Sequence, residues 1–129
     1  MTAYAAPLAD LRFLLNRVLG LADVLGQAGH GHTTADVDAV LEQAGRFAAE
    51  ILAPLNRIGD QNPARLENGV VRTPPGFADA YRQFVAGGWN AVAADPEHGG
   101  QGLPTTVSTA LTELWNSANM SFSLCPLLT

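Results

Sequence analysis

Lysine is absent from the sequence, and all seven basic residues are arginine. This absence excludes the phosphate-binding motifs whose chemistry depends on a lysine side chain. The formal net charge of -5 at pH 7 also argues against nucleic acid as a partner, because neutralising its phosphates requires clustered Lys or Arg. The sequence contains no such cluster.

Cysteine occurs once, as Cys125, so no disulfide can form within the chain and a reducing compartment is expected. No stretch is long and uncharged enough to span a bilayer. The N-terminus carries no basic region, and Asp10, Arg12 and Arg17 interrupt its apolar residues, which argues against a secretory signal. We therefore expect a cytoplasmic protein without a membrane span.

Apolar residues at helical spacing dominate the rest of the sequence. With 47% hydrophobic and 15% charged residues, the 129-residue chain has the composition of a globular protein. Apolar residues recur at steps of three and four in four segments, which predicts mainly helical structure. The segments are Leu8 to Leu19 with a possible continuation to Leu25, Val37 to Leu55, Phe77 to Val85, and Val107 to Ala118 with Phe122 and Cys125 on the same face. The first is expected to stop near Gly20, and the last to begin near Pro104 or Thr105.

Local signals set the expected ends of these helices. Thr33 and Asp36 match a capping box at the start of the second helix, and Pro54 is expected to kink or end that helix near Ala53. Between Arg65 and Thr73, the pair Asn68-Gly69 suits a tight turn joining two very short strands. We therefore expect an all-α fold with at most one small hairpin.

The stretch from Asp95 to Pro104 contains three glycines and two prolines. Backbone N–H groups in such a turn can form an anion-binding nest. Against this, no Lys or Arg occurs after Gln83, and Asp95 and Glu97 add negative charge. We favour a structural corner between two helices, with Trp89 packing the turn onto them.

Other candidate chemistry is sparse. His30, His32 and His98 lack the spacing of metal ligands, and solvated loop histidines are the simpler interpretation. Glu113 has Ser and Thr neighbours and suits a general base, but carboxylates on a helix surface are mostly just solvated. No metal or catalytic site is predicted from these residues.

Three segments resemble the N-terminal helical domain of the acyl-CoA dehydrogenases. The stretch from Gly88 to Pro104 matches a signature of Gly-Trp followed by Pro-Glu-x-Gly-Gly-x-Gly. Leu66-Glu-Asn-Gly-Val-Val with Pro74-Pro-Gly-Phe77, and Tyr4-x-x-Pro7-x-x-Asp10-x-Arg12-Phe13, extend the match. Together they are similar to the branch with an N-terminal extension, which includes 3-methylmercaptopropionyl-CoA dehydrogenases and some bacterial long-chain enzymes.

The resemblance implies one helical domain of a three-domain flavoenzyme that also has a middle β-barrel domain and a C-terminal four-helix domain. In that family a glutamate removes the α-proton of an acyl-CoA thioester while FAD accepts a hydride from the β-carbon. The helical domain then serves as an apolar wall of a dry site. In these terms, residues 1–33 form the N-terminal extension and residues 34–129 form the helical domain.

The sequence departs from the family pattern by ending early, in the apolar segment from Cys125 to Thr129. The Thr-Glu-Pro and Gly-Ser-Asp elements that lie against the flavin are absent, and the catalytic glutamate belongs to the C-terminal domain. None of the five Glu residues inherits that role, so no catalytic, FAD-binding or metal-binding residue is assigned. We expect a truncated piece that, alone, neither holds FAD tightly nor turns over acyl-CoA.

By position, the resemblance assigns the stretch from Ser121 to Leu128 to the pocket for the acyl chain. The candidate substrate contacts are Phe122, Leu124, Cys125 and Leu127. These residues are about equally expected simply to pack the core, and the two roles are compatible. The expected partners are acyl-CoA, the missing middle and C-terminal domains, and further copies of the full-length enzyme in a homo-oligomer.

A function of another class stays open beside this one. The chain could be a stand-alone helical interaction module, derived from such a domain, that buries an exposed apolar stripe against a partner protein. A stop codon after Thr129 together with a stable homodimer favours the module. An open reading frame that continues into Thr-Glu-Pro and Gly-Ser-Asp excludes it.

Overall fold

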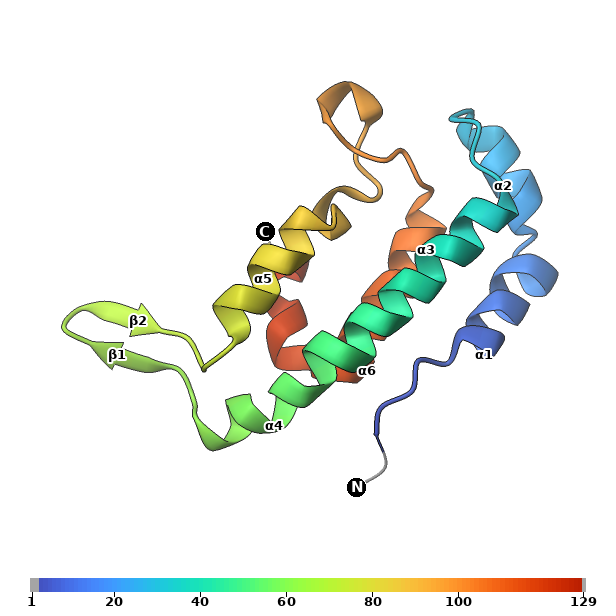
Figure 1. The fold of residues 1–129 in the computed structure, drawn as a ribbon. Coiled ribbons are helices and arrows are strands. Elements are labelled where there is room, and N and C mark those ends of the chain that lie inside the picture. The colour runs from blue at the N-terminus through green and yellow to red at the C-terminus, as the bar shows by residue number, and fades with distance from the viewer. Residues whose placement is uncertain (1–2, 129) are drawn as a thin grey trace.

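The computed structural model describes residues 3–128 of the chain. It consists of helices with one small hairpin at the edge (Figure 1), which confirms the predicted all-α class. The predicted N-terminal extension begins at Met1 and the predicted helical domain ends at Thr129. Both of these residues lie outside the described residues. None of the helices described is long and apolar enough to cross a membrane.

The N-terminal segment forms two helices instead of one continuous helix. Helix α1 (Leu8–Phe13) runs into a π-helical turn, η1 (Leu14–Val18), and helix α2 spans Leu21–Ala28. The possible continuation past Leu19 is therefore wrong. Gly20 separates the two helices, because its φ of 63° lies in the left-handed region that glycine adopts without strain.

An arginine anchors α1 to the next helix. Arg12 donates from Nε to Asp38 Oδ1 over 3.2 Å and from Nη2 to Glu42 Oε1 over 2.7 Å. These hydrogen bonds, that to Glu42 first, raise the pKa of Arg12 above its ordinary value. Because the three side chains are partly exposed, we assign the cluster an orienting role and little net stability.

The second predicted helix is longer than expected. Helix α3 (Thr34–Phe47) begins with the predicted capping box, in which Thr33 Oγ1 accepts from the Asp36 N–H and the Asp36 carboxylate accepts from the Thr33 N–H. These bonds from Thr33 hold the pKa of Asp36 below its ordinary value. The chain continues through the π-helical turn η2 (Ala48–Leu52) into α4 (Ala53–Gln61).

The expectation that Pro54 ends the helix near Ala53 is therefore wrong, although the change from the π-turn to α4 falls at that residue. Proline cannot donate to the carbonyl one turn earlier and so disrupts an ordinary α-helix. Here the Ala53 N–H donates to the Ala48 carbonyl across the wider π-turn. Pro54 thus falls in the first turn of α4, where no N–H donor is needed.

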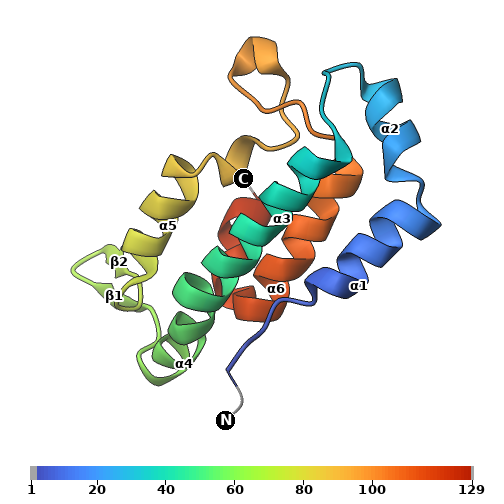
Figure 2. The same cartoon turned by 45° about the vertical axis from the view of Figure 1, so that its right-hand side comes forward.

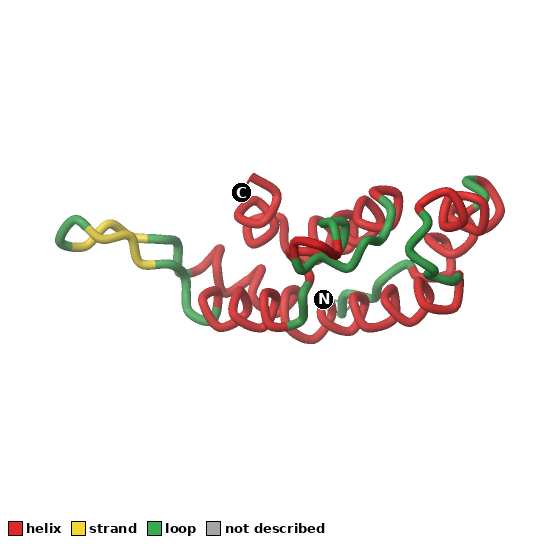
Figure 3. Tube along the Cα trace, turned by 90° about the horizontal axis from the view of Figure 1, so that it is seen from above, coloured by secondary structure: helices red, strands yellow, loops and turns green. Residues whose placement is uncertain are grey.

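The predicted hairpin is confirmed. Strands β1 (Arg65–Glu67) and β2 (Val70–Arg72) pair antiparallel, with Leu66 opposite Val71. Asn68 and Gly69 both have positive φ, 51° and 77°, as a type I′ turn requires. All six strand residues are exposed, and the hairpin extends away from the helices (Figure 3).

Three elements follow the hairpin before the last helix. Helix α5 spans Phe77–Ala86, and two 3₁₀ turns, η3 (Trp89–Ala91) and η4 (Pro96–His98), lie in the glycine-rich connection. Helix α6 (Thr105–Leu128) begins where the sequence predicted. It is broken at Asn119, whose φ of -159° and ψ of 89° are not helical.

The glycine-rich stretch is a structural corner, as favoured from the sequence. The backbone N–H groups of residues 98 to 103 all donate to backbone carbonyls within the connection, so none of these six is available to an anion. At Gly100 the backbone passes so close to Ala94 that an added Cβ would lie 2.0 Å from its carbonyl oxygen. The anion-nest alternative therefore has no donors to act through.

One of the loop histidines is not a solvated residue. His32 is partly buried, and its Nε2 lies 2.7 Å from the Gln101 carbonyl oxygen. The amide nitrogen of Gln101 in turn donates to the Gly88 carbonyl over 2.9 Å. The connection after α2 is thereby fastened to the corner between α5 and α6.

The core lies between α3, η2 and α6, which run side by side in both views (Figure 1, Figure 2). Leucines of the N-terminal segment cover one side, and α5 covers another. An aromatic cluster fills the space under α5, with Trp115 in edge-on contact with Phe47 and Phe84 at centroid distances of 5.7 and 5.8 Å. The most fully buried apolar side chains are Leu21, Val37, Leu41, Ala44, Ala48, Leu52, Val107 and Leu114.

Candidate functional site

The four predicted substrate contacts all lie on the second half of α6, beyond the break at Asn119. Asn119 determines the direction of this half. Its Oδ1 accepts from the Phe122 N–H over 3.0 Å, which caps the new helix, and its Nδ2 donates to the Leu52 carbonyl over 3.1 Å. With only 1% of the residue exposed, Asn119 ties the turn after the break to the π-turn η2.

An apolar groove of about 580 Å³ lies between α4, the base of the hairpin, α5 and the second half of α6. We call it the apolar groove, and the side chains that line it are uncharged. They come from Gly59, Pro63, Ala64, Thr73, Pro74, Phe77, Ala78, Tyr81, Ser121, Phe122 and Cys125. A groove of this volume and lining suits an apolar chain.

Two of the four predicted residues, Phe122 and Cys125, line the apolar groove. Phe122 is 3% exposed and also contacts the aromatic rings of Phe77, Tyr81 and Phe84, with centroid distances of 5.8 to 6.5 Å. It therefore both packs the core and lines the groove, as the two compatible roles allow. Cys125 is exposed at the same groove.

The other two predicted residues lie elsewhere. Leu127 is 53% exposed and lines a different cavity, described below. Leu124 is 48% exposed and lines neither cavity. Helical spacing within this half separates the four side chains, because Phe122 and Cys125 lie one turn apart on one face and Leu124 and Leu127 lie one turn apart on another.

Sequence reasoning missed the aromatic wall that α5 adds to the groove. Phe77 and Tyr81 were predicted only as part of the core-facing side of a helix. One signal was available in Gly59 of α4, where an added Cβ would lie 2.9 Å from Cζ of Phe77. A glycine inside a helix is unfavourable unless a neighbour needs the space, and here the Phe77 ring occupies it.

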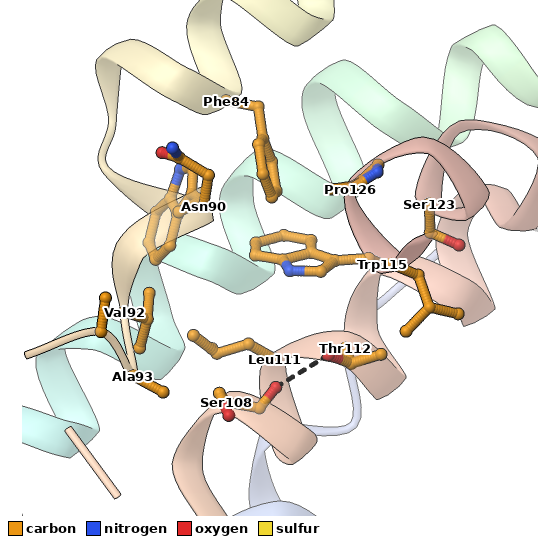
Figure 4. A pocket seen from close by; sticks show the side chains of 13 residues that line it. Phe84, Asn90, Val92, Ala93, Ser108, Leu111, Thr112, Trp115, Ser123 and Pro126 are labelled. Atoms are coloured by element: carbon orange, nitrogen blue, oxygen red, sulfur yellow. Dashed lines mark hydrogen bonds between the residues drawn. The ribbon is translucent and has the colours of Figure 1, made fainter. Parts of the chain in front are cut away.

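The second cavity, of about 230 Å³, lies between the corner, α5 and α6 (Figure 4). We call it the Trp pocket, because both tryptophans of the chain line it. The ring centroids of Trp89 and Trp115 are 5.4 Å apart, and the planes of the two rings meet at 66°. The remaining lining residues are Phe84, Asn90, Val92, Ala93, Ala94, Ser108, Leu111, Thr112, Ser123, Pro126 and Leu127.

Neither cavity is lined by a charged residue. The pyrophosphate of FAD requires cationic or backbone N–H donors, so neither cavity fits that cofactor, and no step is assigned through it here. Within residues 3–128, no group of three or more His, Cys, Asp or Glu side chains could hold a metal ion. What the two cavities offer is shape, apolar surface and a few uncharged polar groups.

No protein-family model matches the chain. It is 46% identical over 129 residues to a 3-methylmercaptopropionyl-CoA dehydrogenase of Ruegeria pomeroyi. The match covers 98% of this chain, which spans 22% of the length of that relative. The predicted relationship is thereby confirmed: over nearly its whole length, the chain is similar to part of an acyl-CoA dehydrogenase.

Proposed function

We propose that this chain is the N-terminal helical domain of an FAD-dependent acyl-CoA dehydrogenase, with residues 1–33 as its extension. The complete enzyme would oxidise the Cα–Cβ bond of an acyl-CoA thioester. The observation that carries the proposal is 46% identity across 98% of the chain, to a relative whose name states that reaction class. An all-helical fold with one small hairpin agrees with it.

In this proposal the apolar groove forms one wall of the acyl site. Its lining offers the rings of Phe77, Tyr81 and Phe122, with Cys125 beside them. Sulfur makes favourable contacts with aromatic rings, so this lining also suits a thioether such as the acyl group in the relative's name. We propose a short acyl-CoA, with or without a thioether, as the substrate class.

The contribution of the chain to the chemistry is to exclude water. A dry site strengthens the electrostatic stabilisation of an enolate-like transition state. The catalytic base and the residues that hold FAD are assigned to the parts of the enzyme outside this chain, together with any oligomer contacts. No residue of the chain therefore receives a catalytic or cofactor-binding role.

The first test compares the 129-residue chain with the longer polypeptide. We expect the purified chain to stay colourless after incubation with FAD and to leave an electron-accepting dye oxidised in the presence of 3-methylmercaptopropionyl-CoA. The longer polypeptide should be yellow and reduce the dye. A yellow, active 129-residue chain would contradict the division of roles, and an inactive longer enzyme, tested with a series of acyl-CoAs, would contradict the proposed reaction.

The second test concerns the groove in the complete enzyme. Cys125→Phe adds a ring where the exposed Cys125 lines the groove, and the ring would occupy volume that the acyl chain needs. We expect KM for the acyl-CoA to rise about ten-fold or more, measured by steady-state kinetics. Leu124→Phe is the matched control, since Leu124 lines neither cavity. If the two substitutions raised KM equally, the groove would not be part of the acyl site.

The stand-alone interaction module remains a second candidate because of a specific surface. Four apolar side chains near the end of α1 and in η1 are strongly exposed: Phe13 60%, Leu14 45%, Val18 60% and Leu19 53%. Single exposed apolar residues are ordinary, but a group of this kind marks an interaction surface. The DNA downstream of codon 129 and the mass of the chain in sedimentation equilibrium decide between the candidates.

A further inference from the structure

We propose that the Trp pocket is a second binding site, which takes a small uncharged ligand bearing a carbonyl group on an apolar body. The indole N–H of Trp115 is the donor that recognises the carbonyl. This inference does not depend on the proposed function, because it concerns a cavity separate from the apolar groove and uses only residues of this chain.

The side chain of Trp115 is deeply enclosed, yet its polar atom is not satisfied by the protein. Trp115 is 4% exposed, and its Nε1 makes no hydrogen bond with any described residue. Among these residues every fully enclosed side-chain nitrogen or oxygen has a partner, so Nε1 must reach open space. Figure 4 shows the indole crossing the pocket with its nitrogen on the edge away from Phe84.

An indole N–H in such a position favours an acceptor. A ligand that enters the pocket displaces water from this accessible N–H, and leaving the donor without a partner then costs about 1 to 3 kcal/mol. Indole nitrogen can only donate, so the matching group on a ligand is a carbonyl or another lone-pair acceptor. A buried tryptophan usually has a partner for this atom, which makes its absence within the protein informative.

The hydroxyl groups of the pocket do not compete for this role. Ser108 Oγ donates to the Thr105 carbonyl, and Thr112 Oγ1 donates to the Ser108 carbonyl, each over 2.9 Å. Ser123 Oγ donates to the Met120 carbonyl over 3.0 Å and also bonds Asn116 Oδ1. The hydrogens of these hydroxyls are used within α6. Asn90 also lines the pocket but is exposed, and Trp89 is only half-buried, so the indole of Trp115 is the enclosed side-chain donor at the cavity.

Size and charge narrow the ligand class. The volume of about 230 Å³ falls below the range of roughly 300 to 1,000 Å³ that drug-sized ligands occupy. A single ring with a short side chain therefore fits. An ionised group does not, because the lining carries no charge to compensate its lost hydration. The walls of Trp89, Trp115 and Phe84 favour an apolar or aromatic body.

The test uses acetanilide as the probe and isobutylbenzene, which has a similar shape but no carbonyl, as its matched hydrocarbon. The chain contains two tryptophans, so an NMR spectrum of the ¹⁵N-labelled protein has two indole N–H signals. Acetanilide should move the Trp115 signal to lower field, as a new hydrogen bond requires. Isobutylbenzene should not.

Two variants separate the hydrogen bond from the shape of the cavity. Trp115→Phe retains an aromatic ring but removes the donor, and it should weaken acetanilide binding about two- to ten-fold more than it weakens isobutylbenzene binding. Trp89→Phe is the control, because it changes the other indole of the pocket and keeps the proposed donor. It should weaken both probes alike.

Three results would overturn the proposal. The Trp115 signal in the unmodified chain could fail to respond to acetanilide, which would mean that the pocket holds only water. Trp115→Phe could weaken both probes alike, which would leave the indole N–H without a role. In the longer polypeptide, neither probe could bind at Trp115, which would mean that a protein segment fills the pocket. The first result needs no variant, so a misfolded Trp115→Phe does not remove the test.

Discussion

The side chain of Asn119 makes two hydrogen bonds, one through its oxygen and one through its nitrogen. Its carbonyl oxygen caps the second half of α6 through the Phe122 N–H, and its amide reaches the Leu52 carbonyl, 67 residues away in the sequence. A hydroxyl can replace the cap alone, and a methyl group can replace neither bond. This single side chain therefore orients the segment that carries Phe122 and Cys125 towards the groove.

Asn119→Ala should lower the free energy of unfolding by about 2 to 3 kcal/mol, since a helix cap and a buried hydrogen bond are lost together. Urea denaturation followed by circular dichroism measures the loss. Asn119→Ser, which keeps a capping oxygen, should lose about half as much. Equal stability of the Ala variant and the unmodified chain would show that the break in α6 does not depend on this residue.

The helices could be predicted from the sequence, but not all of the breaks within them could. Helical spacing and the capping box located α3 and the start of α6. The π-turn that admits Pro54 and the break at Asn119 depend on distant contacts, which spacing along the chain does not contain. Gly20 was recognised near a helix end, yet its left-handed backbone starts a second helix there.

Two glycines of the N-terminal helices should respond oppositely to alanine. Gly26 lies inside α2 with open space around it, so Gly26→Ala should stabilise the protein by about 0.5 to 1 kcal/mol. Gly20 has a φ of 63°, so Gly20→Ala should destabilise it by about 1 kcal/mol or more. Thermal melts of both variants check the pair, and shifts of the same sign would contradict the helix break.

The whole molecule has one continuous core, although its sequence reads as an extension followed by a domain. Leu11, Leu15, Leu21 and Leu25 of the N-terminal segment belong to the same buried cluster as the residues of α3 and α6. The Tyr4 hydroxyl lies 2.8 Å from Ser117 Oγ on α6. The division at residue 33 stays a prediction about sequence relationship, while physically the two segments pack as one unit.

Removal of residues 1–32 should therefore abolish cooperative folding. Four leucines with at most 5% exposure would be lost, and each buried leucine contributes about 1.5 to 3 kcal/mol. Their sum of about 6 to 12 kcal/mol is comparable to the whole stability of a small domain. Circular dichroism during heating should show no sharp transition. A cooperative melt of the shortened chain would mean that the extension is dispensable for folding.

The exposed apolar surface of the whole molecule agrees with a chain that packs against other protein. Exposed apolar side chains occur on η1, on the hairpin and on the second half of α6, among them Leu66 at 74% and Leu124 at 48%. Such a distribution fits both the proposed helical domain and the interaction module. The two candidates differ in what covers this surface, which the tests above decide.

Local pattern alone dictated the helical class, the hairpin and the corner, because these follow from spacing and turn residues. The groove itself came from tertiary packing. Phe77 and Phe122 stand 45 positions apart, so their meeting required α5 and the redirected end of α6 to fold against each other. The unpartnered nitrogen of Trp115 likewise became visible only in three dimensions, because satisfaction of a buried donor depends on every neighbour that the fold brings near it.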